Sequence, residues 1–453
     1  MLSFIYSVIG FILAIAVLVT VHEFGHYWVA RRLGVKVLRF SVGFGKPIWR
    51  KVAGKDQVEY VIAAIPLGGY VKMLGEGDDE YTEAESHRAF DNQPLWKRVC
   101  IVFAGPLINF LFAILIYAGL NQYGFQASKP VVGAIPQESV LYQSGVREND
   151  ELVSVDGKVF TYFREHDLYI FNHALNRDSI TLKVNSNGTE KDIVVDFSKL
   201  TVKSYKPSFL AWEIGMHGVR PKALPIISRL KDGFPAAQAG LKAGDKVVQI
   251  NDDKVSSWAD IVRFVGEAND GLMDVGVQRN GEFKWFSLRP KLIERDGKTV
   301  KQIGISPEIK AVPEELLFHY QDDFGGSLGR AVSQTWQMSS LTVRILVKML
   351  TGQASHKNVS GPITIASIAG EALQLSWVYY LSILAAISIS LGVMNLLPVP
   401  MLDGGHLLYY AIEAVKGSPL SEQAMIVGQK IGLLLLAGLM SLAFYNDIFR
   451  LFN

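Results

Sequence analysis

The sequence predicts a polytopic α-helical membrane protein with four transmembrane helices and a two-copy α+β insertion between the second and third of them. Of its 453 residues, 49% are hydrophobic and only 19% are charged, which is more apolar than an ordinary soluble protein. Long apolar stretches, one basic cluster and an internal repeat together predict this organisation. The formal net charge of +2 is close to neutral and indicates no nucleic-acid partner.

Four stretches are long and apolar enough to cross a bilayer, whose hydrocarbon core of about 30 Å requires roughly 20 residues of helix. They are residues 2–21, 99–120, 377–397 and 426–445. The first stretch lacks a preceding basic region and a small-residue cleavage site. We therefore interpret it as a retained span and not as a signal peptide.

A basic cluster between the first two spans predicts the orientation of the chain, because positively charged loops stay in the cytoplasm. Both termini and the long segment 122–376 are then expected on the extracytoplasmic side. The short segment 398–423 is expected to return to the cytoplasmic side. The cluster comprises Arg31, Arg32, Lys36, Arg39, Lys46, Arg50, Lys51 and Lys55.

The long segment contains an internal repeat. Gly145 and Asp150 of one copy are matched in order and spacing by Gly240 and Asp245 of a second copy. The second copy predicts a strand, a short helix, a glycine-ended turn and a further strand. Beyond the repeat, residues 326–350 predict an amphipathic helix, which either lies at the membrane surface or is partly buried in a soluble domain.

The candidate catalytic residues lie in the sequence H-E-F-G-H at the end of the first span. Residues four apart share one face of a helix, so His22 and His26 can bind one metal ion, with Glu23 beside them as a non-ligand. Cys100 is the only cysteine, so the ligands must be His, Asp or Glu. Ionisable groups at the end of a span usually mark function. The alternative is a helix end whose polar side chains reach the membrane interface.

Catalytic zinc normally has three protein ligands and an open position for water, so a third ligand must lie elsewhere in the chain. Asp403 is the best candidate, because Pro398 and Pro400 end the third span and bring the chain back to the level of the two histidines. Glu23 would then take a proton from the water and pass it to the leaving amine. The alternatives are an N-capping role for Asp403 and a ligand role for His406.

Further motifs extend this pattern over essentially the whole chain. Together with H-E-F-G-H and the sequence N-x-x-P-x-P-x-x-D-G that begins at Asn395, they make the chain similar to the site-2 protease family of intramembrane zinc metalloproteases. The supporting motifs are G-F-G at 43–45, P-L-G-G-Y-V-K at 66–72, F-A-G-P-L-I-N at 103–109 and S-G-P at 360–362.

The resemblance implies one zinc ion per chain, held by His22, His26 and Asp403. It also implies that Glu23 is the catalytic base and acid, and that Asn395 contacts the substrate or the transition state.

The resemblance further implies a membrane-reentrant β-hairpin over residues 62–74, whose edge pairs with an unwound substrate helix. The pair Gly68-Gly69 between two short apolar runs agrees with such a hairpin. Gly68, Gly69, Tyr70 and Asn109 are the expected substrate-binding residues in addition to Asn395. For Asn109, a packed amide beside a helix kink at Pro106 is an equal alternative.

The implied domains are an N-terminal membrane part (1–121), two extracytoplasmic PDZ domains (122–221 and 222–310), amphipathic and linker helices (311–375) and a C-terminal membrane part (376–453). PDZ domains bind peptides by strand addition, so the pair would either bind peptide ends or act only as a steric filter.

The implied activity is cleavage of transmembrane segments of single-pass membrane proteins in a bacterial inner membrane, with the active site toward the cytoplasm and the termini and PDZ domains in the periplasm. An anti-sigma factor already trimmed by another protease, in an envelope stress response, and remnant signal peptides are the implied substrates. The lipid bilayer is the other partner. A membrane-anchored PDZ scaffold, a transporter or a soluble-type metallopeptidase on a signal anchor are the alternatives.

Overall fold

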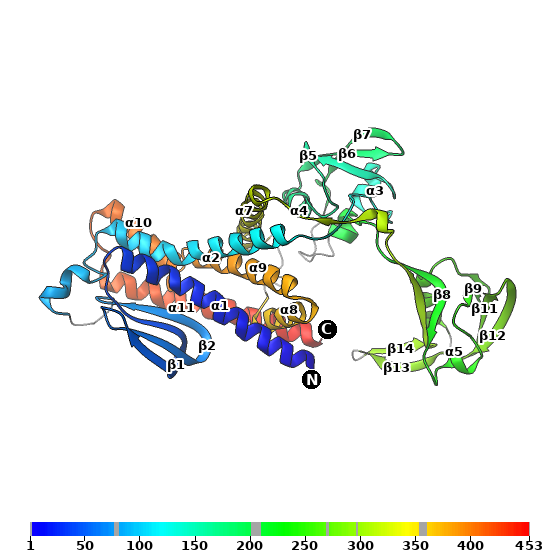
Figure 1. Ribbon diagram of the computed structural model, residues 1–453, viewed down its shortest axis with the longest axis horizontal. Coiled ribbons are helices and arrows are strands. Elements are labelled where there is room, and N and C mark those ends of the chain that lie inside the picture. The colour runs from blue at the N-terminus through cyan, green and yellow to red at the C-terminus, as the bar shows by residue number, and fades with distance from the viewer. Residues whose placement is uncertain are drawn as a thin grey trace.

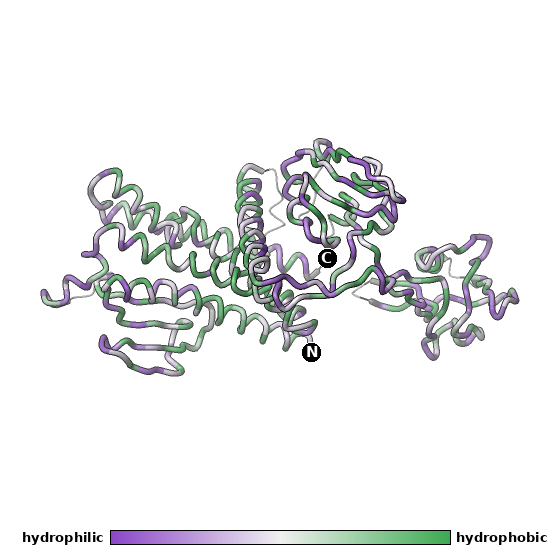
Figure 2. The backbone as a smooth tube through the Cα atoms, turned by 45° about the horizontal axis from the view of Figure 1, so that its top comes forward, coloured by the Kyte–Doolittle hydropathy of each residue, from purple (hydrophilic) through white to green (hydrophobic). Residues whose placement is uncertain are grey.

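The computed structural model describes residues 2–76, 81–200, 210–268, 271–295, 298–352 and 360–452. The molecule is elongated, with a bundle of long helices at one end and two β-sheet regions at the other (Figure 1). The residues of the bundle are largely hydrophobic, whereas polar and hydrophobic residues mix in the β-sheet regions (Figure 2).

Within the described part of the chain, four helices are long and apolar enough to span a membrane. α1 is 31 residues long, or about 46 Å, and therefore extends beyond a hydrocarbon core of about 30 Å. The H-E-F-G-H sequence consequently lies inside α1 and not at its end. The four helices are α1 (Leu2–Arg32), α2 (Leu95–Tyr123), α9 (Trp377–Asn395) and α11 (Glu422–Phe452).

Two shorter helices complete the bundle. α10 (Asp403–Lys416) lies at one end of it, and both chain termini lie at the opposite end, toward the β-sheet regions (Figure 1). α8 (Pro362–Leu375) begins at the carboxylate of Asp447 on α11, which accepts hydrogen bonds from the amides of Gly361 at 2.9 Å and Ile363 at 2.8 Å. These bonds satisfy amides at the start of α8 that no helix bond can reach.

β1 (Val37–Ala53) and β2 (Val58–Met73) form an antiparallel sheet beside α1. Both strands turn back on themselves, so that residues 39–42 of β1 pair with 59–62 on one side and with 69–72 on the other. The arms of the hairpin expected over residues 62–74 are thus separated by β1 and do not form a simple hairpin. Gly43 (φ +94°) and Gly68 (φ +136°) permit the reversals, because positive φ angles strain other residues.

Within its described residues, the first β-sheet region contains a four-stranded sheet of order β5-β4-β6-β7, two α-helices and one short π-helix. Its core is built from buried aliphatic and aromatic side chains between Val132 and Met216. The elements are α3 (Val140–Ser144), β4 (Glu151–Val155), β5 (Lys158–Val159), α4 (Asp167–Asn176), β6 (Ser179–Ser186), β7 (Thr189–Asp196) and η2 (Leu210–Ile214).

The second region contains a six-stranded sheet of order β12-β11-β9-β8-β15, with β10 paired to β9, and has its own core between Ile227 and Ile305. A separate hairpin, β13–β14, extends from it. The elements are β8 (Lys222–Leu230), α5 (Pro235–Gln238), β9 (Lys246–Ile250), β10 (Asp253–Lys254), α6 (Trp258–Glu267), β11 (Met273–Arg279), β12 (Glu282–Leu288), β13 (Lys291–Arg295), β14 (Lys298–Gln302) and β15 (Ile305–Lys310).

The two regions repeat one local design. In each, a short helix, a strand, a short paired strand, a longer helix and two antiparallel strands follow one another. The carboxylates of Asp150 and Asp245 accept backbone hydrogen bonds from Arg147 at 2.9 Å and Lys242 at 2.8 Å. The matched residues of the repeat therefore stabilise the same turn in both copies.

A two-stranded antiparallel ladder joins the segment before the two β-sheet regions to the segment after them. β3 (Phe125–Ser128) follows α2 and pairs with β16 (Leu317–Tyr320), so the chain leaves and re-enters the membrane part at one place. The short helix η3 (Glu314–Leu316) precedes β16, and η1 (Glu83–Arg88) precedes α2 at the other end of the bundle.

α7 (Phe324–Leu350) connects the first β-sheet region with the bundle. Ala331 and Met338 pack against α2 and α9, whereas Leu341 and Ile345 pack against the first β-sheet region. Trp336 and other apolar side chains on the remaining face are exposed. α7 is thus an amphipathic helix that is partly buried within the protein.

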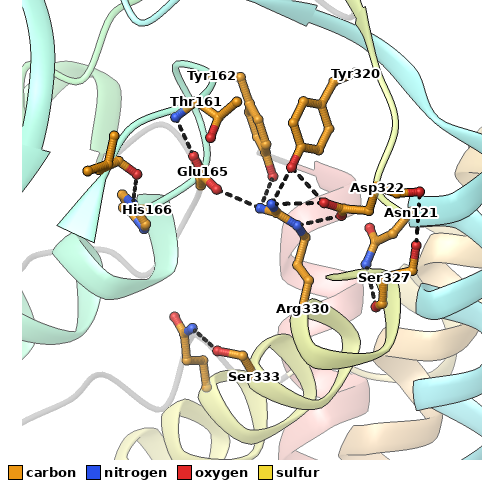
Figure 3. A network of polar contacts seen from close by, with 12 residues as sticks. Asn121, Thr161, Tyr162, Glu165, His166, Tyr320, Asp322, Ser327, Arg330 and Ser333 are labelled. Atoms are coloured by element: carbon orange, nitrogen blue, oxygen red, sulfur yellow. Dashed lines mark hydrogen bonds and ion pairs between the residues drawn. The ribbon is translucent and has the colours of Figure 1, made fainter. Parts of the chain in front are cut away.

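Arg330 of α7 connects the first β-sheet region with β16 and with the segment before α7, as Figure 3 shows. Its guanidinium donates to Glu165 of the first β-sheet region at 2.7 Å and to Asp322 at 2.7 Å. It also donates to the hydroxyl of Tyr320 on β16 at 2.5 Å. Two carboxylates around one guanidinium give a network that is stronger than an isolated surface ion pair.

Candidate metal centre

Three side chains from distant parts of the sequence converge in the helical bundle. Nε2 of His22 lies 3.1 Å from Oδ2 of Asp403, and Nε2 of His26 lies 3.5 Å from its Oδ1. The two Nε2 atoms are 3.2 Å apart. The potential ligand atoms of these three residues all lie within 4.8 Å of one another. His406 is exposed and lies outside this group.

The loop between α9 and α10 brings Asp403 to the histidines. It folds tightly: a Cβ on Gly404 would lie 2.2 Å from the Leu397 carbonyl oxygen, and a Cβ on Gly405 would lie 2.5 Å from that of Val399. Asp403 is the first residue of α10, and its side chain points to the histidines without capping the helix. The N-capping alternative for Asp403 is therefore wrong.

Two glycines let α1 and α2 approach each other at the histidines. A Cβ on Gly25 would lie 2.5 Å from the Ala104 carbonyl oxygen, and a Cβ on Gly105 would lie 2.2 Å from Nε2 of His26. Both are closer than real atoms allow, so each position requires glycine. The close approach to Ala104 explains why glycine occupies position 25 of the H-E-F-G-H sequence. Gly105 was not singled out as a site residue from the sequence.

The distances fit a single zinc ion. Zinc–nitrogen and zinc–oxygen bonds of about 2.0–2.1 Å in a tetrahedron separate the ligand atoms by about 3.3–3.4 Å. The observed separations fall around this value: 3.2 Å between the two Nε2 atoms, 3.1 Å from His22 to Oδ2 and 3.5 Å from His26 to Oδ1, so that each carboxylate oxygen faces one histidine. Oδ2 of Asp403 is buried and has no hydrogen-bond partner among the described residues, which leaves its lone pairs for a cation.

The surroundings of the Asp403 carboxyl act on its pKa in opposite directions. Burial alone would raise its pKa, but the neighbouring imidazoles of His22 and His26 outweigh this effect and hold the pKa below its ordinary value. His26 is also held in the tautomer that a metal requires, because its Nδ1–H donates to the Ile101 carbonyl at 2.9 Å and Nε2 is left to face Asp403. Nothing in the sequence indicated this role of the Ile101 carbonyl.

The two predicted asparagines both lie beside His22. Nδ2 of Asn395 is 3.3 Å from Nε2 of His22, at the edge that faces Asp403. Nδ2 of Asn109 is 3.1 Å from Nδ1 of His22, and Asn109 is fully buried. A fully buried side chain behind the ring has no access to a substrate. Of the two, Asn395 is the better placed for a substrate contact.

The three residues predicted on the β-sheet have different surroundings. A Cβ on Gly69 would lie 2.7 Å from Val19 Cγ1 and 3.1 Å from Glu23 Cγ, so the backbone of β2 passes directly beside Glu23. A Cβ on Gly68 would lie 2.3 Å from the Phe44 ring. The Tyr70 side chain is engaged within the sheet, where its hydroxyl accepts a hydrogen bond from Arg39 at 3.0 Å.

Gly105→Ala is expected to weaken zinc binding by about tenfold to a hundredfold or more, because the added methyl group occupies the position of the His26 ring. Gly119→Ala is the matched control on the same helix, since nothing lies within 4 Å of the added methyl group there. Zinc affinity is measured by competition with a chelator. Equal affinities of the two variants would contradict the close approach of α2 to His26.

Known proteins are similar to this sequence over the length of the chain. Residues 10–439 match the model of peptidase family M50. The chain belongs to this family. It is similar to "Regulator of sigma-E protease RseP" of Escherichia coli (strain K12), with 38% identity over 453 residues and 100% of both chains covered.

The names of two other relatives include the word zinc. "Putative zinc metalloprotease" of Vibrio cholerae serotype O1 is 39% identical over 455 residues, with 100% of both chains covered. "Putative zinc metalloprotease PM1991" of Pasteurella multocida is 38% identical over 454 residues, covering 99% of this chain and 100% of the relative. The protein is accordingly a zinc metalloprotease, as the sequence predicts.

Proposed function

We propose that this M50 protein is an intramembrane endopeptidase that cleaves transmembrane segments of single-pass membrane proteins. The observation that carries the proposal is the position of the candidate ligands. His22 and His26 lie within a candidate membrane span, and Asp403 follows another span closely. Ionisable residues are costly at such positions and usually mark function. One zinc ion per chain fits this set of ligands.

In the proposed reaction each residue has a separate role. Zinc bound at this site supplies a water molecule of lowered pKa and polarises the peptide carbonyl. Glu23, beside the ligands on α1, takes the proton from the attacking water and delivers it to the leaving amine. Asn395, with its amide at 3.3 Å from His22, donates a hydrogen bond to the carbonyl oxygen of the scissile bond.

We infer that residues 69–71 of β2 hold the substrate as an added strand. A helical substrate hides its carbonyls in internal hydrogen bonds, so it must be extended before water can attack. Residues 69–71 pair with β1 on one side within the described chain, and Gly69 lies beside Glu23. Strand addition at this edge would replace the hydrogen bonds lost from the helix.

The sheet itself is proposed to enter the membrane from the cytoplasmic side. Its far part exposes large apolar side chains, including Phe44, Ile48, Trp49, Ile62 and Ile65. Such a surface is unfavourable in water and favourable in lipid. The basic residues between the first two spans support the same orientation, with the active site toward the cytoplasm.

The two β-sheet regions are proposed to be PDZ domains on the periplasmic side of a bacterial inner membrane, where both termini also lie. The names of relatives such as "Regulator of sigma-E protease" support an anti-sigma factor as substrate. Trimming of this factor by another protease would precede cleavage. The PDZ pair would exclude untrimmed proteins by size or bind the new peptide ends, and remnant signal peptides are proposed as further substrates.

The experiment compares trimmed and untrimmed single-pass substrates in proteoliposomes. The intact protein is expected to cleave the trimmed form much faster. A variant in which residues 130–315 are replaced by a short turn should cleave both forms at similar rates. The ends of this replacement lie side by side, because Lys129 donates to the Leu316 carbonyl at 2.8 Å.

Glu23→Gln in the shortened variant is the control for contaminating proteases. Cleavage of neither substrate by a folded, zinc-containing intact protein would contradict the endopeptidase proposal. A shortened variant that still rejects untrimmed substrates would contradict only the filter.

A further inference from the structure

We propose that Asn109 is a positioning residue for zinc: its amide oxygen accepts a hydrogen bond from Nδ1–H of His22 and fixes the tautomer in which Nε2 can bind the metal. This role differs from the substrate contact expected from the sequence. The inference rests on the proposed ligand role of His22.

The first observation is an unsatisfied amide. Asn109 is 0% exposed, and its Nδ2 lies 3.1 Å from Nδ1 of His22. Its Oδ1 is also buried, but has no hydrogen-bond partner among the described residues. The nitrogen and oxygen of an asparagine amide have nearly the same shape, so hydrogen bonding decides its orientation.

The second observation is the tautomer that the site demands. Nε2 of His22 faces Asp403 at 3.1 Å and His26 at 3.2 Å, so it is the nitrogen available to a metal. A metal-binding nitrogen of neutral imidazole carries no proton, and the proton must then be on Nδ1. Nδ1–H needs an acceptor, which an amide NH₂ group cannot be. Rotation of the Asn109 amide by half a turn supplies one.

The third observation is that α2 places a hydrogen-bonding group opposite Nδ1 of each histidine. Ile101, Gly105 and Asn109 are four residues apart and share one face of α2. The Ile101 carbonyl accepts from Nδ1–H of His26 at 2.9 Å, and Gly105 leaves room for the rings. Asn109 occupies the corresponding place one turn further, opposite Nδ1 of His22.

The backbone of Asn109 is itself fixed. Its carbonyl accepts a hydrogen bond from the hydroxyl of Ser388 on α9 at 2.8 Å, and Ser388 is fully buried. Asn395 is the other amide near His22, but its Nδ2 lies 3.5 Å from Nδ1 and closer, at 3.3 Å, to Nε2. Asn109 is therefore the better partner for Nδ1.

The test compares Asn109→Leu with Asn109→Asp in the full-length protein. Leucine keeps the branched shape of the side chain and removes the acceptor, so zinc affinity should fall by about tenfold to a hundredfold, as for other groups that orient a metal ligand. Aspartate keeps an acceptor oxygen and has no NH₂ group, so affinity should stay within about threefold of the wild type. Zinc affinity is measured by chelator competition, and Co²⁺ absorption spectra report the ligand geometry.

Asn121→Leu is the matched control, because it removes another buried amide of α2, about three turns further along the helix, and should leave zinc affinity unchanged. Wild-type affinity of Asn109→Leu would overturn the inference. So would an Asn109→Asp protein that is folded but loses as much affinity as the leucine variant, since this would mean that the amide donates to Nδ1. A wild-type protein without zinc would refute the proposed function instead, which keeps the two failures distinct.

Discussion

Glu23→Gln is expected to lower the rate of substrate cleavage by about a hundredfold or more, while the zinc content of the protein stays unchanged. Glutamine keeps the shape of the side chain but cannot take a proton from water. Glu23 is not one of the three residues whose ligand atoms converge, so its loss removes no metal ligand. Single-turnover cleavage in proteoliposomes and metal analysis of the same sample measure the two quantities.

Glu371→Gln is the control for Glu23→Gln. Glu371 is an exposed glutamate of α8, and its neighbour Gly370 packs against Ser7, about four turns of α1 away from His22. Both cleavage and zinc content should therefore remain at wild-type levels. Loss of zinc in Glu23→Gln would mean that Glu23 is a ligand. Wild-type cleavage by Glu23→Gln would mean that another group is the base.

Alanine at His22, His26 or Asp403 should abolish stable zinc binding and cleavage together. Each substitution removes one of three protein ligands, and the remaining two cannot hold zinc at ordinary free concentrations. Zinc per chain should fall from near one to well below one after dialysis against a weak chelator.

His406→Ala is the control for these ligand variants. His406 is three residues from Asp403 but exposed and outside the group of converging ligand atoms, so its loss should preserve both zinc and cleavage. The ligand assignment fails if Asp403→Ala keeps full zinc content while His406→Ala loses it.

Periodicity and spacing predicted the parts of the fold that depend on local sequence. The four spans follow from apolar stretches, and the pairing of His22 with His26 follows from the helical repeat. The ends of the helices could not be predicted in the same way. α1 continues to Arg32 because polar residues also form helix once it leaves the apolar layer, so hydropathy alone does not mark its end.

The shape of the β1–β2 sheet could not be predicted from the sequence for a different reason. The pair Gly68-Gly69 indicated a reversal of the chain, but pairing partners depend on contacts between distant residues. Residues 39–42 lie between the two arms, and nothing in the local pattern of residues 62–74 indicates this insertion.

The role of Asn109 likewise depends on tertiary structure. The sequence allowed either a substrate contact or a packed amide beside the kink at Pro106. The choice requires the burial of Asn109 and its distance of 3.1 Å from His22, which arise only when α1 and α2 pack. The role of Gly105 could not be predicted for a similar reason. Glycine in a membrane helix has many uses, and only the position of the His26 ring identifies this one.

We propose that two helical histidines and an aspartate from the other end of the chain hold one zinc ion. The most direct measurement is the zinc-edge X-ray absorption spectrum of the purified full-length protein in lipid, together with its zinc content. We expect about one zinc per chain, with two imidazole nitrogens and carboxylate oxygen at about 2.0–2.2 Å. Absence of zinc from active protein, or a spectrum with sulfur or a single imidazole among the ligands, would contradict it.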